Sequence, residues 1–317
     1  MKLTSILTII IILLLSSVQS VWGRDDCKVE FEPVQDTFLY GMVPALRFRI
    51  TNFSNEKISL LGLSGDKITI FDVEINKRPE LDNWHTEGVI SVDALETISL
   101  EYSLSGSRPY IGEIDLENFV FPEDDSPYRF FYPLGKFKVY APFKINKGKD
   151  SDWDSYISCE FEVQIPTGHD KVVFDSLVTA RLLGRNFSDY EANKAQAREI
   201  YRKLLRDNPD SPYRHVLIFS VINGYQIELG LQESLPKRVE LANWYLDNSS
   251  EYFPKPLRHT MGVVITYYKS QNDKSGLIRR FRKLANKADE TSFARYKLER
   301  KINSIEAMSA DKFKVNY

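Results

Sequence analysis

The chain has few of the residues and motifs from which metal sites and catalytic centres are built. It contains two cysteines and four histidines, and no His-Glu-x-x-His pattern for zinc. It has no glycine-rich loop that could cradle phosphate, and Gly62-Leu-Ser-Gly65 lacks the full spacing of a nucleophile elbow. These absences disfavour an enzyme, although a triad assembled from distant residues stays open. No cofactor is predicted.

Long hydrophobic runs are also scarce, because the run Ile6–Leu15 has no later counterpart. It follows the positive Lys2 and is about as long as the apolar part of a secretory signal, which is too short to span a bilayer comfortably. Small residues fit cleavage after Ser20 or Gly23, and we favour Gly23. The sequence predicts a signal peptide over residues 1–23 and an exported protein that is periplasmic, at the cell surface or secreted. An uncleaved anchor is the alternative.

The two cysteines are candidates for a disulfide. Cys27 opens the first expected strand after the signal, and Cys159 lies in the last strand of the same half. First and last strands of a sandwich often lie close together, and an exported protein meets oxidising conditions. A Cys27–Cys159 disulfide is therefore predicted, with two buried or free thiols as the alternative.

Charge divides the chain into two halves. Residues 24–168 carry 26 Asp and Glu against 15 Lys and Arg, whereas residues 169–317 carry 18 against 26. Opposite signs suit either docking of the halves on each other or two different partners. The alternative is that the charge of a solvated surface simply varies along the sequence without any partner. A nucleic-acid partner is not expected, because no platform of basic and aromatic residues is present.

The first half consists of short stretches that alternate between apolar and polar residues. In Ala45–Phe53, Leu46, Phe48 and Ile50 would face a core while the arginines between them face water. Further strands are expected at 27–32, 57–63, 67–75, 87–92, 97–102, 135–143 and 157–165. No long amphipathic helix is evident, so residues 24–168 are predicted to form an antiparallel β-sandwich.

Three of these pieces resemble immunoglobulin-like domains of exported bacterial proteins, including folds of the proteinase-inhibitor type. They are Arg47-Phe-Arg-Ile-Thr-Asn-Phe-Ser-Asn-Glu, Leu95-Glu-Thr-Ile-Ser-Leu and Pro133-Leu-Gly-Lys-Phe-Lys-Val-Tyr. The Cys–Trp–Cys pattern of antibody domains is absent. The resemblance implies an Ig-like β-sandwich as the fold and does not imply inhibition.

An aromatic insert interrupts the expected strands over Ser107–Pro133, with the acidic run Glu123–Asp125 inside it. Aromatic side chains on a loop can form a binding surface, because they supply contact area at a low entropy cost. They can equally form a small satellite core beneath the loop. The candidate binding residues are Tyr110, Phe119, Phe121, Tyr128, Phe130 and Tyr132.

The acidic stretch Asp150-Ser-Asp152-Trp-Asp154 has the alternate spacing of a calcium loop. Ser155 replaces the turn glycine, and Phe161 occupies the position of the distant glutamate. These departures favour an acidic polar loop over a calcium site.

The second half changes to a helical period near Lys171. Helices are expected at 172–183, 188–207, 212–229, 235–248, 256–270, 275–288 and 292–305, with Ser188 and Glu191 forming a capping box. Ala197, Tyr201 and Pro209 resemble the small residue, aromatic and terminal proline of tetratricopeptide (TPR) repeats. The resemblance covers about residues 175–290 and implies helical hairpins that present a shallow concave surface to a peptide or protein.

One expected helix gathers basic residues opposite an apolar face. Arg279, Arg280, Arg282 and Lys283 form this basic cluster, together with Lys287. An anionic partner, including the acidic first half, is one interpretation, and a solvated helix face is the other.

Together these features predict an exported, non-catalytic protein-interaction or scaffold protein of the cell envelope. Residues 24–168 would form an Ig-like sandwich, and residues 169–317 a TPR-like helical domain that binds a protein or peptide. The alternative is a secreted hydrolase or protease inhibitor whose site lies at the aromatic insert or at the junction of the two domains.

Overall fold

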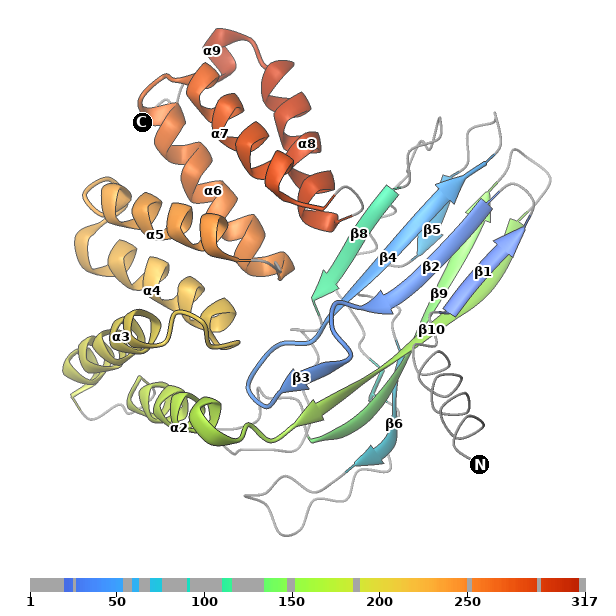
Figure 1. Cartoon of the computed structure of the whole chain (residues 1–317), viewed down its shortest axis with the longest axis horizontal. Helices are drawn as coiled ribbons and strands as arrows, with labels where there is room; N and C mark the ends of the chain where they lie inside the picture. Colours follow the sequence, from blue (N-terminus) through green and yellow to red (C-terminus); the bar gives the residue numbers. More distant parts are fainter. Residues whose placement is uncertain are drawn as a thin grey trace, which may run out of the picture. The chain divides into compact units, whose positions relative to one another are not determined.

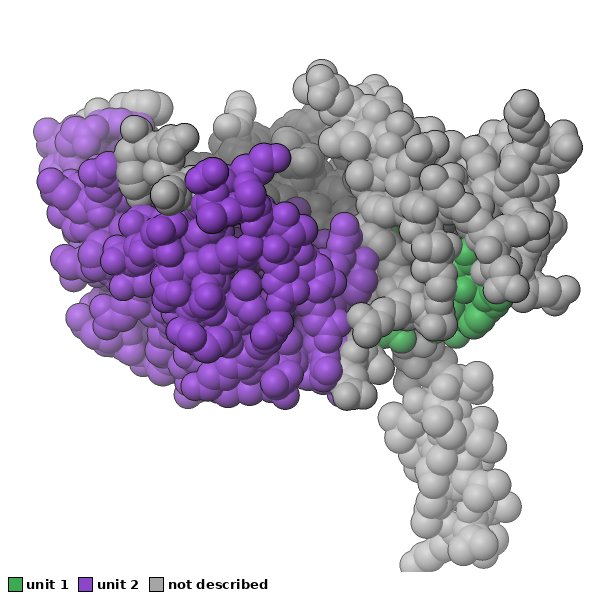
Figure 2. Space-filling view, turned by 90° about the horizontal axis from the view of Figure 1, so that it is seen from above, with its two compact units in different colours: residues 1–164 green, residues 165–317 purple. Residues whose placement is uncertain are grey.

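The computed structural model divides into a strand unit and a helical unit (Figures 1 and 2). Unit 1 covers Met1–Gln164 and unit 2 covers Ile165–Tyr317. The structure describes residues 20–24, 27–53, 59–62, 69–75, 90–91, 110–115, 134–146, 152–184, 189–249, 253–289 and 292–313. The predicted α-helical C-terminal region is confirmed, and the described elements of unit 1 are all strands.

The first sheet of unit 1 is antiparallel throughout. Its strands are β1 (Ser20–Arg24), β2 (Cys27–Pro33), β4 (Ala45–Asn52) and β8 (Tyr110–Asp115), in the order β1-β2-β4-β8. Burial alternates along β4, where Leu46 and Ile50 are fully buried and Phe48 nearly so. The predicted alternation in this strand is confirmed, and it fixes which face of the sheet meets the core.

The second sheet combines early and late segments of unit 1. Its strands are β3 (Thr37–Leu39), β5 (Ser59–Gly62), β6 (Thr69–Ile75), β7 (Ile90–Ser91), β9 (Gly135–Asn146) and β10 (Asp152–Gln164). Their order is β3-β10-β9-β6-β7, and β5 also pairs with β9. The β3–β10 pairing is parallel, whereas the others are antiparallel.

Aromatic residues of the second sheet form part of the core of unit 1. Phe161 of β10 packs between Phe38 and Phe137, with ring centroids 5.5 and 5.2 Å apart. β10 also contacts β2 of the first sheet, whose Phe31 is fully buried. The two sheets therefore share apolar packing in addition to their internal hydrogen bonds.

The two possible cleavage positions of the predicted signal, after Ser20 and after the favoured Gly23, both fall within β1. Ser20–Arg24 pairs with Cys27–Phe31, whereas the apolar run Ile6–Leu15 lies outside the described residues. Cleavage after Ser20 would leave most of β1 on the mature chain, and cleavage after Gly23 would remove most of it. Signal cleavage itself stays a prediction.

Cys27 and Cys159 are both buried and are not joined by a disulfide in the structure, and the disulfide between them stays a prediction. Burial raises the pKa of the Cys159 thiol, and the nearby carboxylates of Glu160 and Glu32 raise it further. A thiol held in its neutral form is a poor nucleophile, so Cys159 reacts slowly while the unit stays folded.

Unit 2 is a chain of consecutive helices. They are α2 (Gly168–Leu183), α3 (Tyr190–Asp207), α4 (Arg214–Leu229), α5 (Leu235–Asn248), α6 (Pro254–Ser270), α7 (Lys274–Lys287), α8 (Phe293–Glu306) and the short α9 (Ala310–Phe313). Each helix from α2 to α7 packs against the next one, and α4 also contacts α6. The expected helices from residue 172 onward are present, whereas α9 was not predicted.

Small and large residues both contribute to the buried core of unit 2. Ala197 of α3 and Ala242 of α5 are buried, and so are the larger Tyr213, Tyr245 and Phe281. Because alanine lets two backbones come together while the rings fill the adjacent space, this pattern suits stacked helical hairpins.

Two local predictions need correction. Helix α3 begins after Asp189, which lies in the left-handed region at φ 54° and makes no side-chain cap hydrogen bond; Ser188 lies outside the described residues. The acidic loop predicted before β10 is also wrong in its second part. Asp152 and Asp154 belong to β10, where they pair with Asn146 and Lys144 of β9.

Candidate functional site

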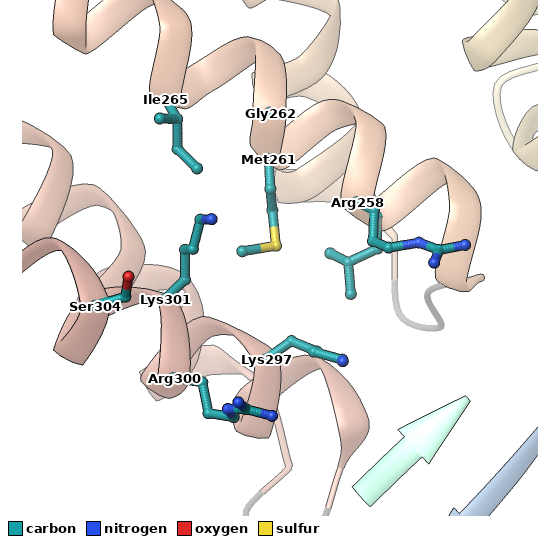
Figure 3. A pocket seen from close by; sticks show the side chains of 9 residues that line it. Arg258, Met261, Gly262, Ile265, Lys297, Arg300, Lys301 and Ser304 are labelled. Carbon is teal, nitrogen blue, oxygen red and sulfur yellow. The ribbon is translucent and has the colours of Figure 1, made fainter. Parts of the chain in front are cut away.

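A groove of about 510 Å³ lies between α6 and α8 of the helical unit (Figure 3). Its volume falls in the usual range for a ligand site, about 300–1,000 Å³. The lining residues are Leu257, Arg258, Met261, Gly262 and Ile265 from α6, and Lys297, Arg300, Lys301 and Ser304 from α8. Four of the nine are basic, and the lining contains neither aspartate nor glutamate.

Helix α6 supplies an apolar floor. Leu257, Met261 and Ile265 recur every four residues, so the helix places them on one face. Leu257 and Met261 are buried, and Ile265 is half-buried. A Cβ atom at Gly262 would meet no other atom within 4 Å, so this glycine leaves the floor open where a larger side chain would partly fill the groove.

Helix α8 supplies a basic wall. The Nζ of Lys297 lies 4.9 Å from the centre of the Phe293 ring, and the guanidinium of Arg300 lies 5.7 Å from that of Tyr296. Such cation–π contacts hold charged side chains without neutralising them. Lys301 has no hydrogen bond, ion pair or ring contact within the described residues, and it rises from α8 toward Met261 and Ile265 in Figure 3.

Side chains of α7 hold the C-terminal end of α8 in position. The Nζ of Lys274 donates to the carbonyl oxygen of Glu306, the last residue of α8, at 3.0 Å and to that of Met308, two residues beyond it, at 2.6 Å. Arg282 adds an ion pair of 2.5 Å to the carboxylate of Glu306. A cation at a helix C-terminus is favoured by the helix dipole, so these contacts stabilise the far wall of the groove.

The predicted basic cluster on α7 is largely engaged inside the unit. Arg280 binds both carboxylate oxygens of Asp247 at 2.9 Å, and its Nε donates to Asn243. This hydrogen bonding lowers the pKa of the Asp247 carboxyl. Arg282 pairs with Glu306, while Arg279 and Lys283 are exposed. The binding role predicted for this cluster stays a prediction, and Arg280 already has a structural partner.

A second internal ion-pair network joins α3 to α4. Arg198 and Arg202 both pair with Glu228, the first at 2.7 Å. Burial alone would raise the pKa of Glu228, but hydrogen bonds from the two arginines lower it. Arg202 also lies 4.7 Å from the centre of the Tyr225 ring. These cations hold two helices together and belong to the fold of the unit.

Arg238 on α5 is the one described arginine of unit 2 that is buried overall, at 6% exposure. Its Nε and Nη1 atoms have no hydrogen-bond partner, and burial lowers its pKa. The Nε2 atom of His259 on α6 is buried without a partner as well, and its pKa is lowered by burial and by Arg238. Buried cationic groups without a counter-ion reduce stability.

His215 on α4 is a histidine satisfied within the core. Its Nδ1 lies 2.7 Å from the hydroxyl of Tyr245, and its ring packs 4.4 Å from that of Phe253. Burial lowers the pKa of His215 to about 3, with a further contribution from Arg214. The side chain is therefore neutral at physiological pH and holds α4 to α5.

The predicted aromatic site falls almost wholly outside the described residues. Tyr110 begins β8, whereas Phe119, Phe121, Tyr128, Phe130 and Tyr132 are not described. Asp150 of the calcium candidate also lies outside them. Within the described parts of the chain, no group of three or more His, Cys, Asp or Glu side chains is placed to hold a metal ion.

The groove was not among the sequence-predicted sites. Its floor and wall come from two helices separated by α7, and each half reads as an ordinary amphipathic helix. The available signal is the run Lys297, Arg300, Lys301 on one face of α8, which does not reveal the helix opposite.

Among the helices that the structure describes, none is both long and apolar enough to cross a membrane.

No protein-family model matches the chain, and the search of curated proteins finds no significant match.

Proposed function

We propose that this is an exported, non-catalytic interaction protein whose helical unit binds a segment of another envelope protein in the α6–α8 groove. The observation that carries the proposal is the composition of the groove, which combines an apolar floor, a basic wall and no lining carboxylate. Such a surface favours a ligand that brings both negative charge and apolar area.

The arrangement of unit 2 supports a TPR-like array. Consecutive helices pack as hairpins, α4 and α6 also touch, and the alanines of the predicted repeat are buried. In such arrays the first helix of each hairpin lines the concave surface. If α2, α4, α6 and α8 are these first helices, the groove between α6 and α8 belongs to that surface.

The strand order of unit 1 supports an Ig-like sandwich. Within the sheet β1-β2-β4-β8, the strands β2-β4-β8 correspond to strands A-B-E of immunoglobulin domains. Within the sheet β3-β10-β9-β6-β7, the strands β10-β9-β6-β7 correspond to G-F-C-C′, while β1, β3 and β5 are additional strands. In this proposal the sandwich positions the helical unit or binds a second ligand. The alternative of a hydrolase or protease inhibitor depends on the aromatic insert, most of which is not described, and it stays a prediction.

The test is affinity capture from native envelope extract with the full mature chain and two variants of equal charge change. Lys301→Glu reverses a charge inside the groove, and Lys203→Glu reverses an exposed charge on α3. We expect a defined protein to be retained by the wild type and by Lys203→Glu but lost with Lys301→Glu. The captured protein, once identified, is then tested for direct binding in purified form. Equal retention by both variants would refute a role for the groove.

A further inference from the structure

The groove carries enough chemical detail to specify the kind of segment that it binds. The nine lining residues include four cations and no aspartate or glutamate, so the lining itself carries positive charge. Lys297 lies over the ring of Phe293, and Arg300 lies over the ring of Tyr296. Their charges are therefore positioned before a ligand arrives. A preorganised cation loses less conformational entropy on binding than one that must be ordered.

Lys301 is the most available of these cations. It has no hydrogen bond, ion pair or ring contact to any described residue, and its side chain is half-buried between Met261 and Ile265 (Figure 3). A carboxylate that reaches Lys301 is therefore drawn next to apolar surface. In that partly desolvated place a charge-assisted hydrogen bond is stronger than in open water.

The floor excludes a purely polar anion as the best ligand. Leu257, Met261 and Ile265 contribute to affinity only when an apolar group covers them, at about 25 cal/mol per Å² of buried area. Aromatic residues are absent from the lining, so the groove offers no stacking surface for a nucleotide base. Methionine adapts to side chains of different shape, which suits an aliphatic or aromatic residue of a peptide.

We propose that the groove binds a short acidic peptide segment in which carboxylates flank one large apolar side chain. The apolar side chain lies over Met261 and the open position at Gly262, and the carboxylates bind Lys301 and the neighbouring basic wall. This inference rests on the proposed function and adds the chemistry of the partner's segment. The volume of about 510 Å³ fits a few residues of a peptide.

The experiment measures fluorescence anisotropy of labelled synthetic peptides with the full mature protein. The probe is a hexapeptide with two aspartates and three glutamates around one central leucine, and it carries a fluorophore at its N-terminus. One control replaces the leucine by serine, and the other replaces the carboxylates by amides. We expect each control to bind at least about tenfold more weakly than the probe, and the probe to weaken as salt rises.

Three variants separate the contribution of the charge at Lys301 from that of the apolar floor at Gly262. Lys301→Glu should weaken the probe by about tenfold or more, whereas the matched Lys203→Glu should stay within about twofold. Gly262→Leu fills the open position without changing charge, so it should weaken the leucine probe more than the serine control. Thermal unfolding of each variant verifies that the fold is kept.

The outcomes distinguish this inference from the broader function. Binding that is equal for the acidic and amide peptides, or unchanged in Lys301→Glu, overturns the acidic-segment proposal. Vesicles of phosphatidylglycerol and phosphatidylcholine form a further arm, and Lys301-dependent binding to them without peptide binding would replace the peptide by a membrane surface. If envelope capture depends on Lys301 while no acidic peptide binds, the ligand chemistry is wrong and the interaction function stands.

Discussion

The α5–α7 interface and the α6–α8 groove are both rich in basic side chains, but they differ in what those side chains meet. Across α5 and α7, Arg280 binds both oxygens of Asp247, and Lys287 lies 3.7 Å from the same carboxylate. The groove has four basic lining residues and no acidic one. The number of basic residues on a helix therefore does not locate a binding surface by itself, because Arg280 already has a carboxylate partner whereas Lys301 has none among the described residues.

The largest expected effect is a loss of stability in a variant of α7, the helix whose basic residues are paired within the unit. The side chain of Phe281 on α7 is fully buried, so Phe281→Ala should leave a cavity and lower the free energy of unfolding by about 3–5 kcal/mol. Urea unfolding followed by circular dichroism measures the change. Ile278→Ala on the same helix, where the side chain is only half-buried, is the control and should cost clearly less. Equal losses would show that α7 is not anchored by Phe281.

Acid should weaken the unit through a buried neutral group. The pKa of His215 is about 3 in the folded chain and about 6.5 when unfolded, so the unfolded state binds the extra proton first as pH falls. Stability is therefore full above pH 6.5 and decreases below it, by about 2 kcal/mol at pH 5 from this residue. His259 acts in the same direction.

Urea unfolding at several pH values between 7.5 and 5 tests this expectation. In His215→Gln, which cannot take up that proton, the decrease over the same interval should be clearly smaller. A variant with the wild-type pH dependence would place the responsible group elsewhere.

Removing the paired arginine is expected to cost less than removing Phe281. Arg280→Ala deletes the hydrogen bonds to Asp247 and Asn243 and should lower the free energy of unfolding by about 1–2 kcal/mol. Arg279→Ala removes an exposed arginine one position earlier and should change stability by less than about 0.5 kcal/mol. Chemical denaturation of both variants gives the comparison, and similar values would mean that the Asp247 pair adds nothing.

Arg238 offers a third environment, which is buried and without a counter-ion among the described residues. Arg238→Met keeps much of the side-chain length and removes the charge. The variant should be as stable as the wild type or more stable by about 1 kcal/mol. The thermal midpoint at fixed pH measures this effect. A clear loss of stability would show that the guanidinium has a compensating partner in the folded chain.

The smallest effect on stability is expected inside the groove. Lys301→Glu alters a half-buried residue with no described polar partner, so its free energy of unfolding should stay within about 0.5 kcal/mol of the wild type. Peptide binding should nevertheless fall. A large loss of stability would assign Lys301 to the fold, and the difference from the α5–α7 interface would then disappear.

The sequence predicted the ranges of individual helices and strands better than the contacts between them. Helix α5 occupies the predicted range 235–248, because its apolar period and its Pro236 near the start define both ends. Acidic composition suggested a loop around Asp152 and Asp154, yet hydrogen bonding to β9 extends the strand through them. Long-range pairing can override local preference, and a single sequence does not display it.

The α6–α8 groove could not be predicted from the sequence for a related reason. Met261 reads as one apolar position of α6 and Lys301 as one polar position of α8, and neither departs from an amphipathic pattern. Only the packing of α7 against both helices brings them to the same cavity. The acidic partners of Arg280 and Arg282 were equally hidden, since Asp247 and Glu306 come from other helices.

The attachment of α8 has a mechanical consequence. Lys274 at the start of α7 donates to the carbonyls of Glu306, which ends α8, and of Met308 just beyond it, and Arg282 further along α7 pairs with Glu306. Because α7 is joined to α6 through the turn Gln271–Asp273, where Asn272 has a φ of 52°, and also packs against α8, it is the element that connects the two sides of the groove. The spacing of α6 and α8 therefore depends on the conformation of this turn together with the contacts of Lys274 and Arg282.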